Sequence, residues 1–296
     1  AARTGQRLAV VLPEHPFPGI ELEQRLDALI VHVNKGQIAL APADLFYRDR
    51  SLYEAEPGMF YPFFSYKGTK AYRSLDERER SVFDGLIARI NSASEAMWEK
   101  RGKAILKELQ AASDMLVCAE DLGAVPDCVP KTLEELGILG LKINRWTKRW
   151  KEEGEPYIPV SEYPYRTVTT PSVHDTSTLA SYWEQEADDS ERKAFLASIG
   201  VTGVETGPYS DVTAATLIKG ILTTSSMICI FQIQDVAGLS QNQELASFSR
   251  ERINVPGTVN DTNWTLRLPL TIDRLEADEK LIRTIRSLTD TRRKRT

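Results

Sequence analysis

The spacing of apolar positions changes near residue 113 and divides the chain into two predicted regions. From 74 to 112 apolar residues recur at helical steps with charges between them, first over about 74–92 and then in an amphipathic stretch over roughly 93–111. The recurring positions include Val82, Phe83, Leu86, Ile87 and Ile90, followed by Trp98, Ile105 and Leu109. The spacing predicts helices whose apolar positions belong to a core.

From 113 onward short apolar runs alternate with helical patterns. Residues 114–121, 139–146, 165–175 and 225–235 are predicted strands, and the first is followed by a helix with Pro130 near its start and Gly137 past its end. Apolar strands that alternate with helices are typical of parallel βαβ units. The pattern therefore predicts an α/β fold for 113–296, with 1–112 as an insertion segment and helices that pack on it.

The region before residue 74 is mixed. Residues 28–42 are predicted to form two short strands around Asn34, Lys35 and Gly36. Residues 57–72 place many aromatics between glycines and prolines, which favours an ordered loop with a small hydrophobic cluster. A sugar-stacking surface is the alternative for Phe60, Tyr61, Phe63 and Phe64.

Composition narrows the classes of function. The 296 residues are 42% hydrophobic and 27% charged, and the net charge of −5 opposes a nucleic-acid surface, which would need a basic stripe. No apolar run approaches the roughly 20 residues that span a membrane. Three cysteines and three histidines lack the spacing of metal ligands, so we expect no metal site and a reduced, cytoplasmic setting. Neither a nucleophile elbow nor a glycine-rich phosphate loop is present.

Carboxylates follow three of the four predicted strands. They are the pair Glu120 and Asp121, then Asp175, then Asp235. In an α/β barrel the active site lies at the carboxyl ends of the strands, and paired carboxylates there suit the cleavage of glycosidic bonds. Each could instead cap the helix that follows it, since Asp is favoured at helix N-caps. We prefer the structural alternative for Asp235 and leave both open for Glu120 and Asp175.

His174 precedes Asp175 and raises two further alternatives, a catalytic dyad and a metal ligand. If both residues lay in a strand, their side chains would point to opposite faces. No second histidine stands at ligand spacing, which argues against a metal. Carbohydrate chemistry remains the class that the residues favour most.

Three segments resemble one known family. They are "CAEDLGAVPDCVPKTLEELGILGLKI", "TPSVHDTSTLASYW" and "QDVAGLSQNQELASFSRERINVPGTVNDTNW", and they are similar to the amylomaltases, the disproportionating 4-α-glucanotransferases of glycoside hydrolase family 77. The resemblance runs from about residue 45 to the end. It implies a (β/α)8 barrel of the α-amylase clan, of which this chain supplies strands five to eight plus a helical and aromatic insertion.

The resemblance also implies roles. Glu120 matches the general acid/base, Asp175 the stabiliser of the transition state, and His174 the neighbour that binds sugar hydroxyls. Asp121, Trp183 and Asn263 match positions expected to bind or shape the substrate site, as do Asn254, Pro256, Gly257 and Trp264. The implied reaction is retaining transfer of α-1,4-glucan segments between malto-oligosaccharides, with no cofactor.

One part of the family pattern is absent. The family's nucleophile lies in an Arg-x-Asp-His motif, but no Asp-His pair occurs in this sequence, and neither Asp27 nor Asp49 fits. We therefore expect a fragment that lacks the N-terminal half of the barrel, a view that the opening without methionine favours, and we expect it to be inactive alone. A non-catalytic glucan-binding or scaffolding module and a retaining α-glucan hydrolase remain as alternatives.

Overall fold

A computed structural model describes residues 52–56, 59–63, 65–123, 125–150 and 152–293. The chain divides into two compact units, residues 1–105 with 123–129, and residues 106–122 with 130–296. One of the three dividing points, 105/106, lies inside a helix and before the predicted boundary of 112/113. The predicted strands in 28–42, Asp27 and Asp49 lie outside the described residues.

The first unit contains a hairpin and a long helix. Strands β1 (Leu52–Glu56) and β2 (Met59–Pro62) pair antiparallel, so part of the aromatic segment is strand and not loop. The short helices η1 (Tyr66–Gly68) and α3 (Lys70–Ser74) follow, and then α4 (Glu77–Ala111). The Asp76 carboxylate accepts the N–H of Glu79 while the Glu79 carboxylate accepts the N–H of Asp76, a reciprocal cap that fixes where α4 begins.

Burial along α4 corrects the predicted core. The helix is continuous for 35 residues, but its buried apolar side chains, Phe83, Leu86, Ile87 and Ile90, all lie in its first half. Trp98, Ile105 and Leu109, predicted to be core, are exposed, and Val82 is exposed as well. Helical spacing identifies a shared face, but whether anything covers that face depends on contacts that spacing does not encode.

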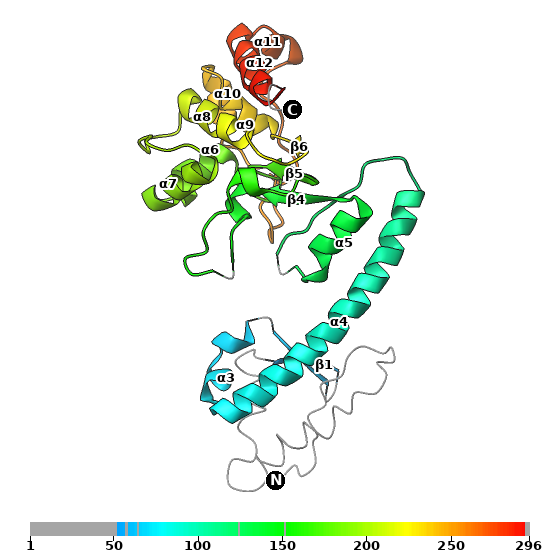
Figure 1. Cartoon of the computed structure of the whole chain (residues 1–296). Coiled ribbons are helices and arrows are strands. Elements are labelled where there is room, and N and C mark those ends of the chain that lie inside the picture. The colour runs from blue at the N-terminus through cyan, green and yellow to red at the C-terminus, as the bar shows by residue number, and fades with distance from the viewer. Residues whose placement is uncertain (1–51, 57–58, 64, 124, 151, 294–296) are drawn as a thin grey trace. The chain divides into compact units, whose positions relative to one another are not determined.

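The second unit contains a parallel sheet of four strands. They are β3 (Cys118–Ala119), β4 (Leu139–Ile143), β5 (Thr167–Thr170) and β6 (Ile228–Cys229), paired in sequence order (Figure 1). The register joins Cys118 to Leu139, and Thr169 to Cys229. This confirms the α/β fold, and neighbours in sequence order are the arrangement of a singly wound barrel.

Helices and helical turns connect these strands and follow the last one. They are α5 (Cys128–Leu136), η2 (Asn144–Trp146), η3 (Val160–Glu162), α6 (Leu179–Ser181), the π-helical turn η4 (Tyr182–Glu186), α7 (Asp189–Ser198), α8 (Asp211–Ile221), α9 (Ile233–Ala237), α10 (Gln243–Phe248), α11 (Ile272–Glu276) and α12 (Glu279–Arg293). Helix α5 ends at Gly137 with φ 68°, a left-handed position that glycine adopts without strain, as predicted. Helix α12 packs on α8, and Arg292 donates to the backbone carbonyls of Leu222, Ser226 and Met227.

All four predicted strands are shorter than expected. Strand β5 ends at Thr170, so His174 and Asp175 lie in a turn and not in a strand. Strand β6 covers two residues, and Asp235 lies in α9. Apolar composition alone does not distinguish a strand from the irregular backbone that continues beyond it.

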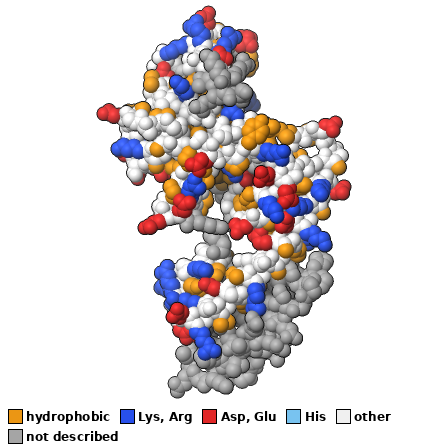
Figure 2. Space-filling view, viewed as in Figure 1, with side chains coloured by type: hydrophobic (Ala, Val, Ile, Leu, Met, Phe, Trp, Pro, Cys, Tyr) orange, Lys and Arg blue, Asp and Glu red, His pale blue; other side chains and the backbone are white. Residues whose placement is uncertain are grey.

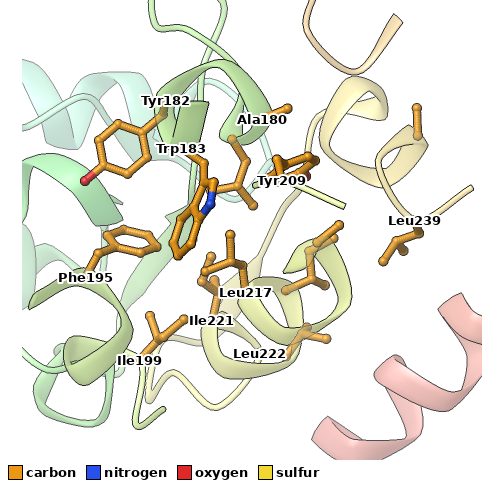
Figure 3. Close-up of a cluster of buried hydrophobic side chains, with 14 of the residues drawn as sticks. Ala180, Tyr182, Trp183, Phe195, Ile199, Tyr209, Leu217, Ile221, Leu222 and Leu239 are labelled. Atoms are coloured by element: carbon orange, nitrogen blue, oxygen red, sulfur yellow. The ribbon is translucent and has the colours of Figure 1, made fainter. Parts of the chain in front are cut away.

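The core of the second unit lies among its helices. Figure 3 shows Trp183 and Phe195 packed beside Leu217 and Ile221 of α8, all of which are at most 2% exposed. The rings of Tyr157 and Tyr182 meet Phe195 edge to face at 5.7 and 5.5 Å between centroids. Burial of these side chains holds the helices against the sheet and so fixes where the loops after the strands begin.

Candidate functional site

The position of Glu120 is set by the end of strand β3. It directly follows β3, whose last residue Ala119 pairs with Gly140 of β4, and its side chain is exposed. A side chain one residue beyond a paired strand has little backbone freedom, while exposure lets its carboxyl reach an incoming molecule. This placement suits the proton donor that the sequence predicts.

Asp121 has a structural set of partners. Its carboxylate accepts the N–H of Leu141 at 2.6 Å and pairs with the Lys142 ammonium at 2.9 Å, and its side chain is 7% exposed. A Cβ at Gly140 would lie 2.8 Å from an Asp121 carboxylate oxygen, so the glycine makes room for this contact. Asp121 therefore ties the segment after β3 to β4, and its predicted contact with substrate stays a prediction.

His174 and Asp175 form a pair within the turn after β5. His174 Nε2 lies 3.2 Å from Asp175 Oδ2, and both side chains remain about half exposed. The expectation that they point to opposite faces is wrong, because the turn departs from the alternation of a strand. The pair presents an imidazole and a carboxylate side by side to solvent.

The segment 252–264 holds this pair from a second direction. Asn254 Nδ2 donates to Asp175 Oδ1 at 2.6 Å, and Arg252 Nη2 donates to the Asp175 backbone carbonyl at 3.1 Å. The Trp264 ring lies 5.0 Å from the His174 ring between centroids. Both oxygens of the Asp175 carboxylate thus have a partner, which fixes the direction in which it points.

Asn263 acts inside that segment. Its Oδ1 accepts the N–H of Val255 at 3.1 Å, and its Nδ2 donates to the Thr258 backbone carbonyl at 3.1 Å. Trp264, at a left-handed φ of 64°, closes the same loop by donating its N–H to the Ile253 carbonyl at 2.8 Å. Asn263 therefore shapes the loop that presents Trp264, while direct contact with substrate stays a prediction.

Trp264 also borders a small cavity. The cavity measures about 240 Å³ and is walled mainly by apolar side chains: Ile233, Phe248, Ile253, Trp264, Leu266 and Leu268, with Gln234. The Gln234 amide is buried and has no hydrogen-bond partner among the described residues. Trp264 thus lines this cavity and also contacts the His174 ring.

Trp183 is a correction to the predicted substrate contacts. Its side chain is 2% exposed within the helical core, and its Nε1 donates to the Gly207 carbonyl at 2.8 Å. The Arg192 guanidinium lies 5.5 Å from its ring centre. A buried indole with its one donor already used packs the core and offers no face to a glucan.

Asp235 has the structural role that we preferred, although it does not cap its own helix. It is fully buried, its Oδ1 accepts the N–H of Leu179 at 2.7 Å, and its Oδ2 accepts from the Ser172 hydroxyl. Burial raises the pKa of this carboxyl, against the lowering effect of its hydrogen bonds and of Arg145. The carboxyl thus joins α9 to the loop that carries His174 and Asp175.

Two residues at the end of β4 were missed by sequence reasoning. Arg145 is buried beneath the loop after β5, and Trp146 is 43% exposed beside it. They lie in η2, directly after β4, which is the strand between β3 and β5, the strands that precede Glu120 and Asp175. The carboxylates were selected because they lie at the ends of predicted strands. Arg145 and Trp146 lie at the end of the predicted strand 139–146, so the same position could have identified them.

Other chemistries find little support in the described part of the chain. Its residues contain no group of three or more histidine, cysteine, aspartate or glutamate side chains that could hold a metal ion. Among these residues, no helix has both the length and the apolar character needed to cross a membrane. Positive and negative side chains are interspersed over the face drawn in Figure 2.

Comparison with known proteins decides the family. The family model of the 4-alpha-glucanotransferases, glycoside hydrolase family 77, matches residues 61–271. The chain belongs to this family. It is 35% identical over 238 residues to the rice 4-alpha-glucanotransferase DPE2 and 38% identical over 192 residues to the 4-alpha-glucanotransferase of Chlamydia muridarum.

These matches cover most of this chain but a minor part of each relative. The rice match spans 77% of this chain and 24% of the relative, and the Chlamydia match spans 64% and 35%. The chain thus spans about a quarter to a third of their length. Among solved structures, it is similar to the amylomaltase of Corynebacterium glutamicum with a TM-score of 0.46 at 20% identity, over 58% of this chain and 28% of that one. A second similar structure is the amylomaltase of Streptococcus agalactiae in complex with acarbose, with a TM-score of 0.44 at 20% identity, over 58% and 30%.

Proposed function

We propose that this chain carries part of an α-glucan transfer site, in which Glu120 is the general acid/base and Asp175 stabilises the transition state. The observation that carries the proposal is the placement of Glu120 after β3 and of His174 with Asp175 after β5. These two strands belong to the same sheet, and β4 lies between them. Neighbouring strands lie about 4.8 Å apart, so these strand ends are separated by about 10 Å. Side chains can narrow that gap around one sugar unit.

The geometry suits the charges of glycosyl transfer. The transition state resembles an oxocarbenium ion, which a fixed carboxylate stabilises. Asp175 is held by Asn254 on one oxygen and lies beside His174 on the other. The His174 imidazole and the exposed face of Trp264 suit the hydroxyls and the apolar face of a sugar ring. Trp146, exposed between the two strand ends, offers a second stacking surface.

The reaction would proceed in two steps. Glu120 protonates the departing glucan oxygen while an aspartate attacks the anomeric carbon, forming a glycosyl ester. Glu120 then removes the proton from the 4-hydroxyl of an incoming malto-oligosaccharide, which displaces the ester with net retention. The substrates would be malto-oligosaccharides and longer α-1,4-glucans, in a cytoplasmic setting, and the chemistry needs no cofactor.

The attacking aspartate would come from an N-terminal barrel half that pairs with this chain. The sequence contains no Asp-His pair of the family's nucleophile motif, and the chain spans 24% of its rice relative. Within the described residues, β3 and β6 each pair on one side only. Unpaired edges of a parallel sheet favour the addition of further strands.

The test is glucan recognition by the chain itself. Titration with maltoheptaose, followed by NMR, should shift the His174 imidazole signals. Asp175→Asn should weaken the response, whereas Asp114→Asn, at an exposed position outside the strands, should leave it unchanged. If maltoheptaose at millimolar concentration leaves the His174 signals unmoved, the proposal is wrong for this chain.

A further inference from the structure

The loop that carries His174 and Asp175 is hydrogen-bonded to two buried side chains, Arg145 and Asp235, which have no role in the proposed steps of glycosyl transfer. Arg145 follows β4, and Asp235 lies in the first turn of α9. Both are buried, at 6% and 0% exposure. Burying an arginine and an aspartate costs free energy unless hydrogen bonds satisfy them, so their partners show what they support.

Most of the partners of Asp235 and of Arg145 lie in residues 172–179. Arg145 Nη1 donates to the Ser177 hydroxyl at 2.5 Å, and Arg145 Nη2 donates to the backbone carbonyls of Ser177 and Thr178 at 3.0 and 3.3 Å. Asp235 accepts from the Ser172 hydroxyl and from the Leu179 N–H. The two side chains thus hold both ends of the loop and leave its exposed centre, His174 and Asp175, between them.

The Arg145 guanidinium is fixed in turn by its surroundings. Its Cζ atom lies 4.4 Å from the Tyr182 ring centre, and Nη1 also lies 3.5 Å from the Glu186 carboxylate. Tyr182 and Glu186 bracket η4, the turn that follows the loop and α6. A planar guanidinium that donates to two backbone carbonyls and also lies over an aromatic ring has a geometry that the lysine ammonium cannot reproduce.

We propose that Arg145 and Asp235 are positioning residues that set the direction of the His174 and Asp175 side chains. This inference deepens the proposed function, because it assigns the support of the same glycosyl site. The loop has no regular secondary structure between Thr170 and Leu179, so hydrogen bonds from buried side chains replace the ladder that would otherwise fix it. Displacement of a reacting group by about 1 Å can cost on the order of 100-fold in rate.

The test compares the NMR signals of the His174 imidazole in the purified chain with those in variants that lose hydrogen bonds of Arg145. Arg145→Lys keeps the charge and removes the planar guanidinium, and Arg149→Lys is the control, because Arg149 lies four residues further on and pairs with the exposed Glu162. In the unaltered chain the Trp264 ring shifts the nearby His174 carbon-bound proton signals. Arg145→Lys should move those signals toward the values of a free imidazole, while the Arg149→Lys chain keeps them unchanged.

A second pair of variants covers the case in which Arg145→Lys does not fold. Ser177→Ala removes one acceptor of Arg145, whereas Ser198→Ala removes a buried hydroxyl that bonds only within α7, to the Phe195 carbonyl. Ser177→Ala should shift the His174 signals, and Ser198→Ala should not. If the variants at 145 or 177 fold with unchanged His174 signals, the positioning role is refuted, whatever the change in melting temperature. This readout needs no glucan, so it stands apart from the test of glucan recognition.

Discussion

Replacement of Trp183 by phenylalanine separates a packing role from contact with substrate. The indole is 2% exposed, and its N–H is bonded to the Gly207 carbonyl at 2.8 Å. Phenylalanine keeps an aromatic ring but removes the donor, which leaves that buried carbonyl without its partner. The unmet carbonyl costs about 1–3 kcal/mol, and the smaller ring leaves a cavity that brings the total to about 2–4 kcal/mol.

Urea unfolding of the second unit measures this loss. With a slope of about 2 kcal/mol per molar urea, the midpoint should fall by about 1–2 M. Trp150→Phe is the matched control, because Trp150 is 58% exposed and its replacement should change the free energy of unfolding by less than about 0.5 kcal/mol. The folded Trp183→Phe chain should bind maltoheptaose as the unaltered chain does. Unchanged stability together with lost glucan affinity would refute the packing role.

Further predictions concern other parts of the two units. Leu217→Ala, at a fully buried position of α8, should lower the free energy of unfolding by about 2–5 kcal/mol in calorimetry, whereas the exposed Val212→Ala should have little effect. Asp121→Ala should cost about 1–3 kcal/mol in urea unfolding, because the β4 N–H that it accepts loses its partner. Desolvation opposes ionisation of Asp84, but hydrogen bonds from two tyrosine hydroxyls outweigh this effect and lower the pKa of the carboxyl from 3.8. The stability that the ionised carboxylate adds is therefore present above about pH 4, and it is lost as the pH falls through the lowered pKa. Asp84→Asn should remove that part of the acid sensitivity in thermal melts, and equal sensitivity in both chains would contradict this assignment.

The order of elements could be predicted from the sequence because local signals encode it. Pro130 and Gly137 bound α5 to within two residues, and the alternation of apolar runs with helical patterns gives the α/β class. The lengths of β5 and β6 could not be obtained in this way. The predicted strand at β5 continues into a loop whose hydrogen bonds come from Arg145 and Asp235, which are distant in the chain, and the predicted strand at β6 continues into α9.

The candidate site, like the fold, could be predicted from the sequence only in part. Glu120 and Asp175 stand out because each follows an apolar run, but the pairing of His174 with Asp175 depends on a turn that apolar alternation does not reveal. Trp183 matches a family position, yet only packing shows that its ring is enclosed. The second half of α4 is the converse case, in which Trp98, Ile105 and Leu109 follow a regular helical pattern but are exposed.

The most direct test of the account is the product ladder formed from maltotriose by the chain combined with an N-terminal half from a related 4-alpha-glucanotransferase. Glu120→Gln serves as the inactive variant, and Glu134→Gln, on the exposed face of α5, serves as the control. The account predicts glucose and longer oligomers with the unaltered chain and with Glu134→Gln, and none with Glu120→Gln. An undiminished ladder with Glu120→Gln would contradict the assignment of the acid/base.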